Sequence, residues 1–175
     1  MRRFVQFSLL SIATCLLTAA VSRAETKVTI SGTHLCCGQC LKAVDATLKD
    51  MAGVKFESSQ DAKTIAIKAD NDEAAQKAVD ALAAAGFYGK LDNDKIKYKT
   101  VSAPEGSVEK IEVSGIHNCC GACTKAITTA VKAVPGVTGA ELKAKQTTFT
   151  VEGKFKASEL VDALLKAGFY AQVKK

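Results

Sequence analysis

The pattern of polar and apolar residues occurs twice along the chain, each time with a strand-like alternation followed by helical spacing. Residues 27–31 and 110–114 alternate between the two kinds, as in a strand with one buried face. A cysteine-rich loop follows each, and then apolar residues recur at helical spacing, at Leu41, Val44, Leu48 and Met51 in the first copy and at Ile127, Ala130, Val131 and Val134 in the second. Gly53 and Gly136 end the two predicted helices.

The later part of each copy predicts two strands, a helix and a last strand. A short strand begins at Val54 or Val137, and a clearer one spans 64–67 or 148–151. The second helices bury a further apolar set, Ala75, Ala78, Val79 and Leu82 or Leu160, Val161, Leu164 and Leu165. An aromatic strand is expected after each. The order βαββαβ predicts an α+β chain of two tandem ferredoxin-like domains, each an antiparallel sheet with two helices on one face.

The two copies match residue by residue. The window 31–40 corresponds to 114–123 at an offset of 83 residues, and 86–88 corresponds to 168–170 at an offset of 82. A long period that occurs twice indicates tandem domains and not a solenoid.

A linker separates the two predicted domains. Residues 99–108 have linker composition, so we expect domains at 25–98 and 109–175. The first domain continues past the repeated pattern, where residues 92–94 predict a turn and residues 96–98 predict an extra strand.

Residues 1–24 have the composition of a secretory signal peptide. Two arginines precede an apolar run at 4–21, and residues 22–24 place small side chains before the expected cleavage point. A retained transmembrane anchor is the alternative, but five polar side chains interrupt the run. We therefore expect an exported chain, periplasmic or secreted, that begins at Glu25 and has no stable membrane insertion after cleavage.

Composition and charge exclude several classes of protein. Hydrophobic residues make up 47% of the chain and charged residues 24%, which is typical of a globular protein and not of a disordered one. The net charge of +6 falls to +3 without residues 1–24, and the remaining charges form no run, so we expect no nucleic-acid partner. RNA binding through a βαββαβ sheet also needs aromatic residues on the central strands, where only Phe149 is found.

Every cysteine and histidine of the expected mature chain lies in the two matching windows. The shared pattern is His-x-Cys-Cys-Gly-x-Cys, after a strand and at the start of a helix. Cys37 with Cys40, and Cys120 with Cys123, are spaced so that one sulfur lies in the loop and the other in the first helical turn. The positive end of the helix dipole favours the thiolate there, which is the form that binds soft metal ions.

The number of ligands limits the choice of metal. Two thiolates suit Cu(I) or Hg(II), whereas adding His34 and Cys36, or His117 and Cys119, gives up to four ligands, as Zn(II) or Cd(II) prefers. We expect one such ion per domain, and one ion clamped between both loops is the alternative. Alternatively, Cys36 and Cys119 are spare or resolving thiols and bind no metal. The alternative for the two histidines is a capping or surface role.

These motifs resemble the heavy-metal-associated domain family, the metal-binding modules of copper chaperones, metal-transporting ATPases and periplasmic mercury scavengers. The likeness extends to the Gly-Val after the first helix and the Gly-Phe-Tyr after the second, in both copies. The resemblance implies that Cys37 with Cys40, and Cys120 with Cys123, carry the metal and pass it on by ligand exchange. It also implies a metal transporter or another metal-binding domain as the partner.

The chain departs from the usual loop of that family. Leu35 and Asn118 stand where the family has Met, Cys36 and Cys119 replace a small polar residue, and the histidines are additional. A higher-coordinate or multi-metal thiolate site is therefore an alternative to two-coordinate copper.

The predicted function is that of a non-catalytic carrier, chaperone or scavenger of metal ions. A disulfide that staples an exported domain is one alternative, although three cysteines per domain leave one unpaired. A thiol–disulfide oxidoreductase is the other, since a Cys-Gly-x-Cys pair at a helix start is also typical of thioredoxins. Neither Pro104 nor Pro135 supplies the proline that thioredoxin-like folds place against their active site.

Overall fold

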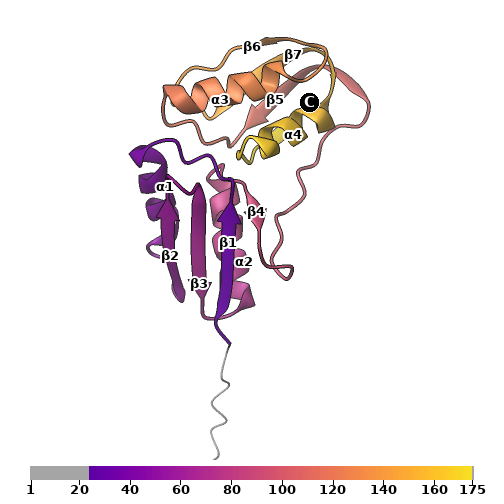
Figure 1. Cartoon of the computed structure of the whole chain (residues 1–175). Coiled ribbons are helices and arrows are strands. Elements are labelled where there is room, and N and C mark those ends of the chain that lie inside the picture. Colours follow the sequence, from indigo (N-terminus) through magenta and orange to yellow (C-terminus); the bar gives the residue numbers. More distant parts are fainter. Residues whose placement is uncertain (1–23, 175) are drawn as a thin grey trace, which may run out of the picture.

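The computed structural model describes residues 24–174 (Figure 1). The expected signal peptide, apart from Ala24, lies outside the described residues. In the described part, no helix is long and apolar enough to cross a membrane.

The first unit has the predicted order of elements. Its sheet runs in the order β2-β3-β1-β4, with every pair antiparallel. The elements are β1 (Thr26–Ser31), α1 (Gly38–Leu48), β2 (Val54–Ser59), β3 (Thr64–Ala69), α2 (Asp72–Ala84) and β4 (Lys90–Leu91).

The second unit repeats this order and topology. Its antiparallel sheet runs β6-β7-β5-β8. The elements are β5 (Ser107–Ser114), α3 (Gly121–Lys132), β6 (Val137–Ala140), β7 (Thr148–Lys156), α4 (Ala157–Lys166) and β8 (Gln172–Lys174). The prediction of two ferredoxin-like α+β units is confirmed.

Alternating burial in the central strands gives each sheet one apolar face. In β1, Val28 and Ile30 are buried and lie opposite Ile67 and Ile65 of β3. The two helices of each unit contact one another and pack on the sheet, α1 with α2 and α3 with α4 (Figure 1). Each unit is therefore a helical layer on a sheet, and burial of apolar surface between the layers stabilises it.

The predicted aromatic strands are wrong, because the Gly-Phe-Tyr segments pair with each other and not within their own sheets. Phe87 and Phe169 form an isolated antiparallel bridge between the two units. The Tyr170 N–H donates to the Gly86 carbonyl at 3.0 Å, and the Tyr88 N–H donates to the Gly168 carbonyl at 3.2 Å. The last strands, β4 and β8, begin only after these segments.

The predicted extra strand over residues 96–98 is also wrong. These residues are irregular, and Tyr98 stacks against Tyr88 of the first unit with ring centroids 4.5 Å apart. The Tyr170 hydroxyl of the second unit donates to the Lys99 carbonyl at 2.9 Å. The segment thus runs as a strap over both units before β5 begins at Ser107, within the expected linker.

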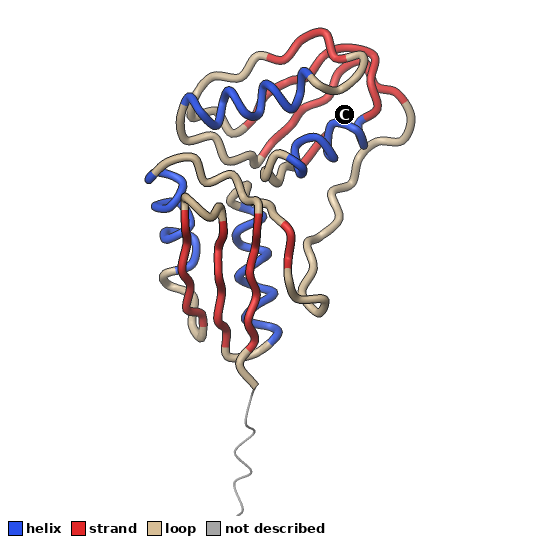
Figure 2. The backbone as a smooth tube through the Cα atoms, viewed as in Figure 1, coloured by secondary structure: helices blue, strands red, loops and turns tan. Residues whose placement is uncertain are grey.

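The path of the chain brings the two cysteine loops face to face. Figure 2 shows the loop before α1 at the end of the first unit that meets the second unit, close to the loop before α3. The bridge between Phe87 and Phe169 lies at the same junction. The predicted ligands of both copies therefore lie at one interface.

Candidate metal centre

Each Cys-x-x-Cys pair straddles the beginning of a helix, as predicted. Cys37 is the N-cap of α1 and Cys120 the N-cap of α3, both with extended backbone. Cys40 and Cys123 lie in the first turns and are fully buried. Each N-cap sulfur lies within 4.0 Å of sulfurs of the other loop, Cys37 near Cys119 and Cys120, and Cys120 near Cys36 and Cys37.

The two loops are anchored by different chemistry at equivalent positions. In the first unit, Leu35 is an apolar anchor that is 2% exposed. In the second unit, the Asn118 amide donates to the carbonyls of Lys143 at 2.8 Å and Gln146 at 3.0 Å, and its oxygen accepts from the Thr124 hydroxyl at 2.8 Å. Both anchors fix the backbone beside the first cysteine of the loop.

The six sulfurs of both loops form one cluster, which we call the six-cysteine centre. All six cysteines are free thiols, and each sulfur has at least three others within 4.0 Å. The shortest of these contacts cross between the units, from Cys36 to Cys120 and to Cys123, both at 3.5 Å. The two loops thus share one group of thiols and do not form two groups set apart.

The contacts within the six-cysteine centre follow the sequence repeat. The Cys36 and Cys40 sulfurs are 3.7 Å apart, and so are their equivalents Cys119 and Cys123. This agreement indicates an approximate two-fold relation between the loops.

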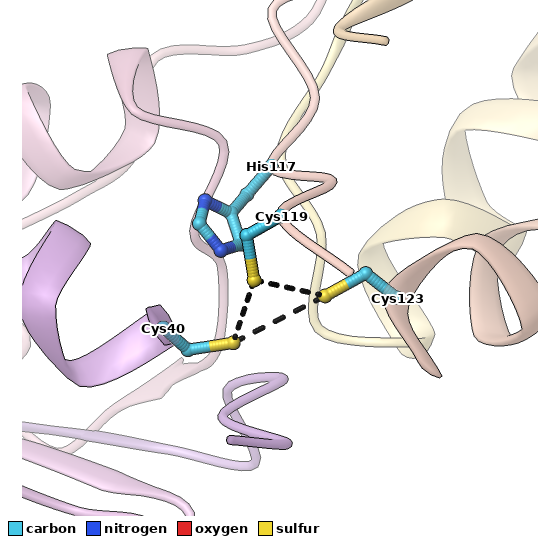
Figure 3. A group of neighbouring side chains, drawn as sticks. All are labelled: Cys40, His117, Cys119 and Cys123. Atoms are coloured by element: carbon cyan, nitrogen blue, oxygen red, sulfur yellow. Dashed lines mark hydrogen bonds between the residues drawn. The ribbon is translucent and has the colours of Figure 1, made fainter. Parts of the chain in front are cut away.

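Both histidines lie at the edge of the six-cysteine centre. One ring nitrogen of His117 is within 4.8 Å of the sulfurs of Cys40, Cys119 and Cys123 (Figure 3). One ring nitrogen of His34 is within 4.8 Å of the sulfurs of Cys36 and Cys123. Within the described residues, the Nε2 atoms of both rings are buried without a hydrogen-bond partner, which leaves them free to act as ligands.

An aromatic ring of the opposite unit positions each imidazole. His34 packs on Phe169 with centroids 4.5 Å apart, and His117 stacks on Phe87 at 4.3 Å. The Phe-Tyr segments, which were predicted as strands of their own units, therefore support the histidines of the other unit. Their repetition in both copies was the one sequence signal for this role.

Hydrogen bonds at the helix starts stabilise some thiolates. The backbone N–H of Cys123 lowers the pKa of the Cys120 thiol to about 6. A hydrogen bond from the Cys123 thiol lowers the pKa of Cys40, and the same bond raises the pKa of Cys123. The centre thus holds thiolate at neutral pH, which is the form that binds metal.

Burial has the opposite effect on the thiol pKa of the first cysteine of each loop. Desolvation raises the pKa values of Cys36 and Cys119 above the usual value for a thiol. Desolvation also lowers the pKa of His34, which keeps its imidazole neutral and able to bind a metal.

The spacing of the sulfurs fits ions with three or four ligands. Thiolates about 2.3 Å from a metal lie about 4.0 Å apart around a trigonal ion and about 3.8 Å apart around a tetrahedral one. A linear ion would separate its two thiolates by about 4.6 Å. The contacts of 3.5 to 4.0 Å observed between the sulfurs therefore agree with three or four ligands.

Comparison with known proteins agrees with this donor set. Residues 110–170 match the heavy-metal-associated domain. The second unit is therefore a heavy-metal-associated domain. The matched residues include the whole second cysteine loop, and the first unit carries the same loop pattern.

Three solved structures are similar to part or most of this chain. The N-terminal domain of PacS from Synechocystis PCC6803 is 28% identical, and the match covers 39% of this chain and 100% of that one, with a TM-score of 0.35. The N-terminal soluble domains of Bacillus subtilis CopA are 20% identical over 87% of this chain and 95% of that one, with a TM-score of 0.32. The first two RRM domains of the yeast poly(U)-binding protein Pub1 are 10% identical over 85% and 98%, with a TM-score of 0.26.

A hollow beside the six-cysteine centre opens the centre to solvent. It has a volume of about 560 Å³ and is bordered by His117 and Cys119 of the second unit and by Gln39 and Ala85 of the first. Cys119 and His117 are therefore reachable without separation of the units.

Proposed function

We propose that this chain is an exported, non-catalytic carrier or scavenger that holds soft metal ions between its two units. The observation that carries the proposal is the six-cysteine centre, in which both loops contribute sulfurs at mutual distances of 3.5 to 4.0 Å. Such a group of thiols with two adjacent imidazoles selects soft or borderline ions. The match of residues 110–170 to the heavy-metal-associated domain supports the same class of ligand.

The proposed cargo is an ion with three or four thiolate or imidazole ligands. Cu(I) in a trigonal site and Zn(II) in a tetrahedral site agree with the sulfur spacing, and Cd(II) and Hg(II) agree with the ligand type. We propose these ions as a class. Cys37, Cys40, Cys120 and Cys123 are the proposed primary ligands, and Cys36, Cys119, His34 and His117 the additional ones.

Partial exposure of the sulfurs supports transfer by ligand exchange. The side chains of Cys37 and Cys120 are half-buried, whereas Cys40 and Cys123 are fully buried. An incoming thiolate of a metal transporter or another metal-binding domain would meet the half-buried sulfurs first.

Metal titration of the reduced, anaerobic protein tests the proposed binding. We expect the mature chain to take up Cu(I) and Cd(II), and a variant with Cys37, Cys40, Cys120 and Cys123 all changed to Ser to lose this uptake. Circular dichroism of the metal-free proteins checks that the variant keeps its fold. Equal uptake by both proteins would contradict the proposal.

Two further measurements test export and the absence of catalysis. N-terminal sequencing of chain recovered outside the cytosol should begin at Glu25. An insulin-reduction assay should give no turnover, whereas steady turnover would favour a thiol–disulfide oxidoreductase.

A further inference from the structure

We infer that the first cysteine of each loop completes the metal site of the opposite unit, so that the chain holds two equivalent ions, each bound by three thiolates. The inference rests on the proposed function and adds which sulfurs act together. Under this assignment, Cys36 acts with Cys120 and Cys123, and Cys119 acts with Cys37 and Cys40.

The sulfurs of Cys36, Cys120 and Cys123 form the most compact group of three that crosses between the units. Cys36 is 3.5 Å from Cys120 and 3.5 Å from Cys123, and Cys120 is 3.8 Å from Cys123. A trigonal ion needs its three thiolates at similar mutual distances, near 4 Å (about 4.0 Å for a metal–sulfur distance of about 2.3 Å). The three sides are similar to one another and somewhat shorter than this distance, so a small outward shift of the side chains would accommodate the ion.

The repeat produces a second triangle of the same kind. Cys119 is 3.9 Å from Cys37 and 3.6 Å from Cys40, and Cys37 is 4.0 Å from Cys40. Each of these residues is the repeat equivalent, 83 positions away, of a member of the first triangle. The two triangles share no sulfur, and together they use all six.

Each triangle also has one histidine beside it. His34 lies within 4.8 Å of Cys36 and Cys123, which both belong to the first triangle. His117 lies within 4.8 Å of Cys119 and Cys40, which both belong to the second. One imidazole thus lies beside each triangle, and a fourth ligand of this type would complete a Cys₃His site for a tetrahedral ion.

Two other groupings of the sulfurs either fit the observed distances less well or leave thiols unused. In a group from one loop, the sulfurs of Cys36, Cys37 and Cys40 lie within 4.8 Å of one another, but the Cys36 and Cys37 sulfurs are not among the pairs within 4.0 Å, whereas every side of the two triangles is 4.0 Å or shorter. A central group of Cys40, Cys119 and Cys123 with His117 binds one ion and leaves three thiols unused (Figure 3).

Cd(II) binding to the full chain tests the assignment in a background where only one triangle is complete. In the variant Cys120→Ser/Cys123→Ser, the triangle of Cys37, Cys40 and Cys119 is intact, and we expect one Cd(II) bound with three sulfurs by X-ray absorption. Adding Cys119→Ser should reduce the sulfur number to two and weaken binding by about 100-fold, since even outer-shell changes cost roughly 10–100-fold. Adding Cys36→Ser instead is the matched control and should change the affinity less than about twofold.

The outcomes separate this inference from the proposed function. If Cys36→Ser weakens Cd(II) binding in this background and Cys119→Ser does not, each loop binds its own ion; the inference is then wrong and the proposed function stands. If the unsubstituted chain binds a single Cd(II) that the loss of Cys37 or Cys120 leaves unaffected, the central group is the site and the inference is again wrong. If the unsubstituted chain binds no Cd(II) and no Cu(I), the proposed function itself fails.

Discussion

The six thiols differ in how readily each gives up its proton. Cys120 lies at a helix start, where the Cys123 N–H lowers its pKa to about 6, whereas desolvation raises the pKa of Cys36. Their sulfurs are nevertheless only 3.5 Å apart. A soft ion that arrives at neutral pH therefore meets a thiolate at Cys120 first and displaces a proton from Cys36 afterwards.

Alkylation of the metal-free protein should reveal this difference. A lowered pKa means that the thiolate of Cys120 persists to lower pH, so its rate with iodoacetamide should rise through a midpoint near pH 6 and level off above it. Cys36 should react slowly at pH 7, because its pKa is raised. Peptide mapping by mass spectrometry measures both rates. Similar rates at the two residues across this pH range would show that the difference is absent.

Within each unit, most elements could be predicted from the sequence because their burial is decided locally. The alternation in β1 and the helical spacing in α1 report contacts made inside one unit, and both predictions are confirmed. The Phe87 and Phe169 segments were assigned to strands wrongly because their partner is the other unit. Periodicity carries no information on such pairing.

The same limit applies to the metal centre. The repeated motif predicted all eight candidate ligands, and the structure brings their six sulfurs together at one interface. The sequence favoured one group of ligands in each unit, because spacing along the chain cannot show that two loops face each other. The polar anchor at Asn118 and the stacking of His117 on Phe87 likewise depend on contacts distant in sequence.

Gly86 follows helix α2 and lets the second cysteine loop approach the first unit, because it has no side chain at the point of contact. It has φ +87°, and an added Cβ would lie 2.1 Å from the His117 backbone nitrogen. Gly106 has φ +76° with nothing within 4 Å of an added Cβ, and it therefore supplies a matched control.

Alanine at these two positions should separate backbone strain from the contact between units. Gly106→Ala should lower the free energy of unfolding by about 1–2 kcal/mol, the cost of a left-handed alanine. Gly86→Ala should cost a further roughly 1–3 kcal/mol because the loop of the other unit must move. Urea denaturation of both variants measures the difference. Equal losses would show that the two units do not approach at Gly86.

At the scale of the whole molecule, the six-cysteine centre and the strap join the same two units. Tyr98 stacks on Tyr88, and the Lys99 carbonyl accepts a hydrogen bond from Tyr170 of the second unit. An ion bound by sulfurs of both units must dissociate before the units can separate. Metal binding should therefore stabilise the junction as well as each unit.

Limited proteolysis should detect this stabilisation. With Cd(II) at about 100 times its Kd, the native state gains roughly 2.7 kcal/mol, and cleavage of residues 99–106 should slow accordingly. The variant with Cys37, Cys40, Cys120 and Cys123 changed to Ser should be cleaved at one rate with and without Cd(II). Stoichiometric Cd(II) binding that leaves the cleavage rate of the unsubstituted chain unchanged would mean that no ion joins the units.

Disulfide trapping tests most directly whether the two loops face each other. We would change the other four mature cysteines to Ser, keep Cys36 and Cys120, and oxidise the dilute, metal-free protein with diamide. Because these sulfurs are 3.5 Å apart, we predict that most chains form an intramolecular Cys36–Cys120 disulfide, identified by peptide mapping without reduction. Chains that stay reduced, or that link only to other chains as a Cys36-only control would, would contradict a shared six-cysteine centre.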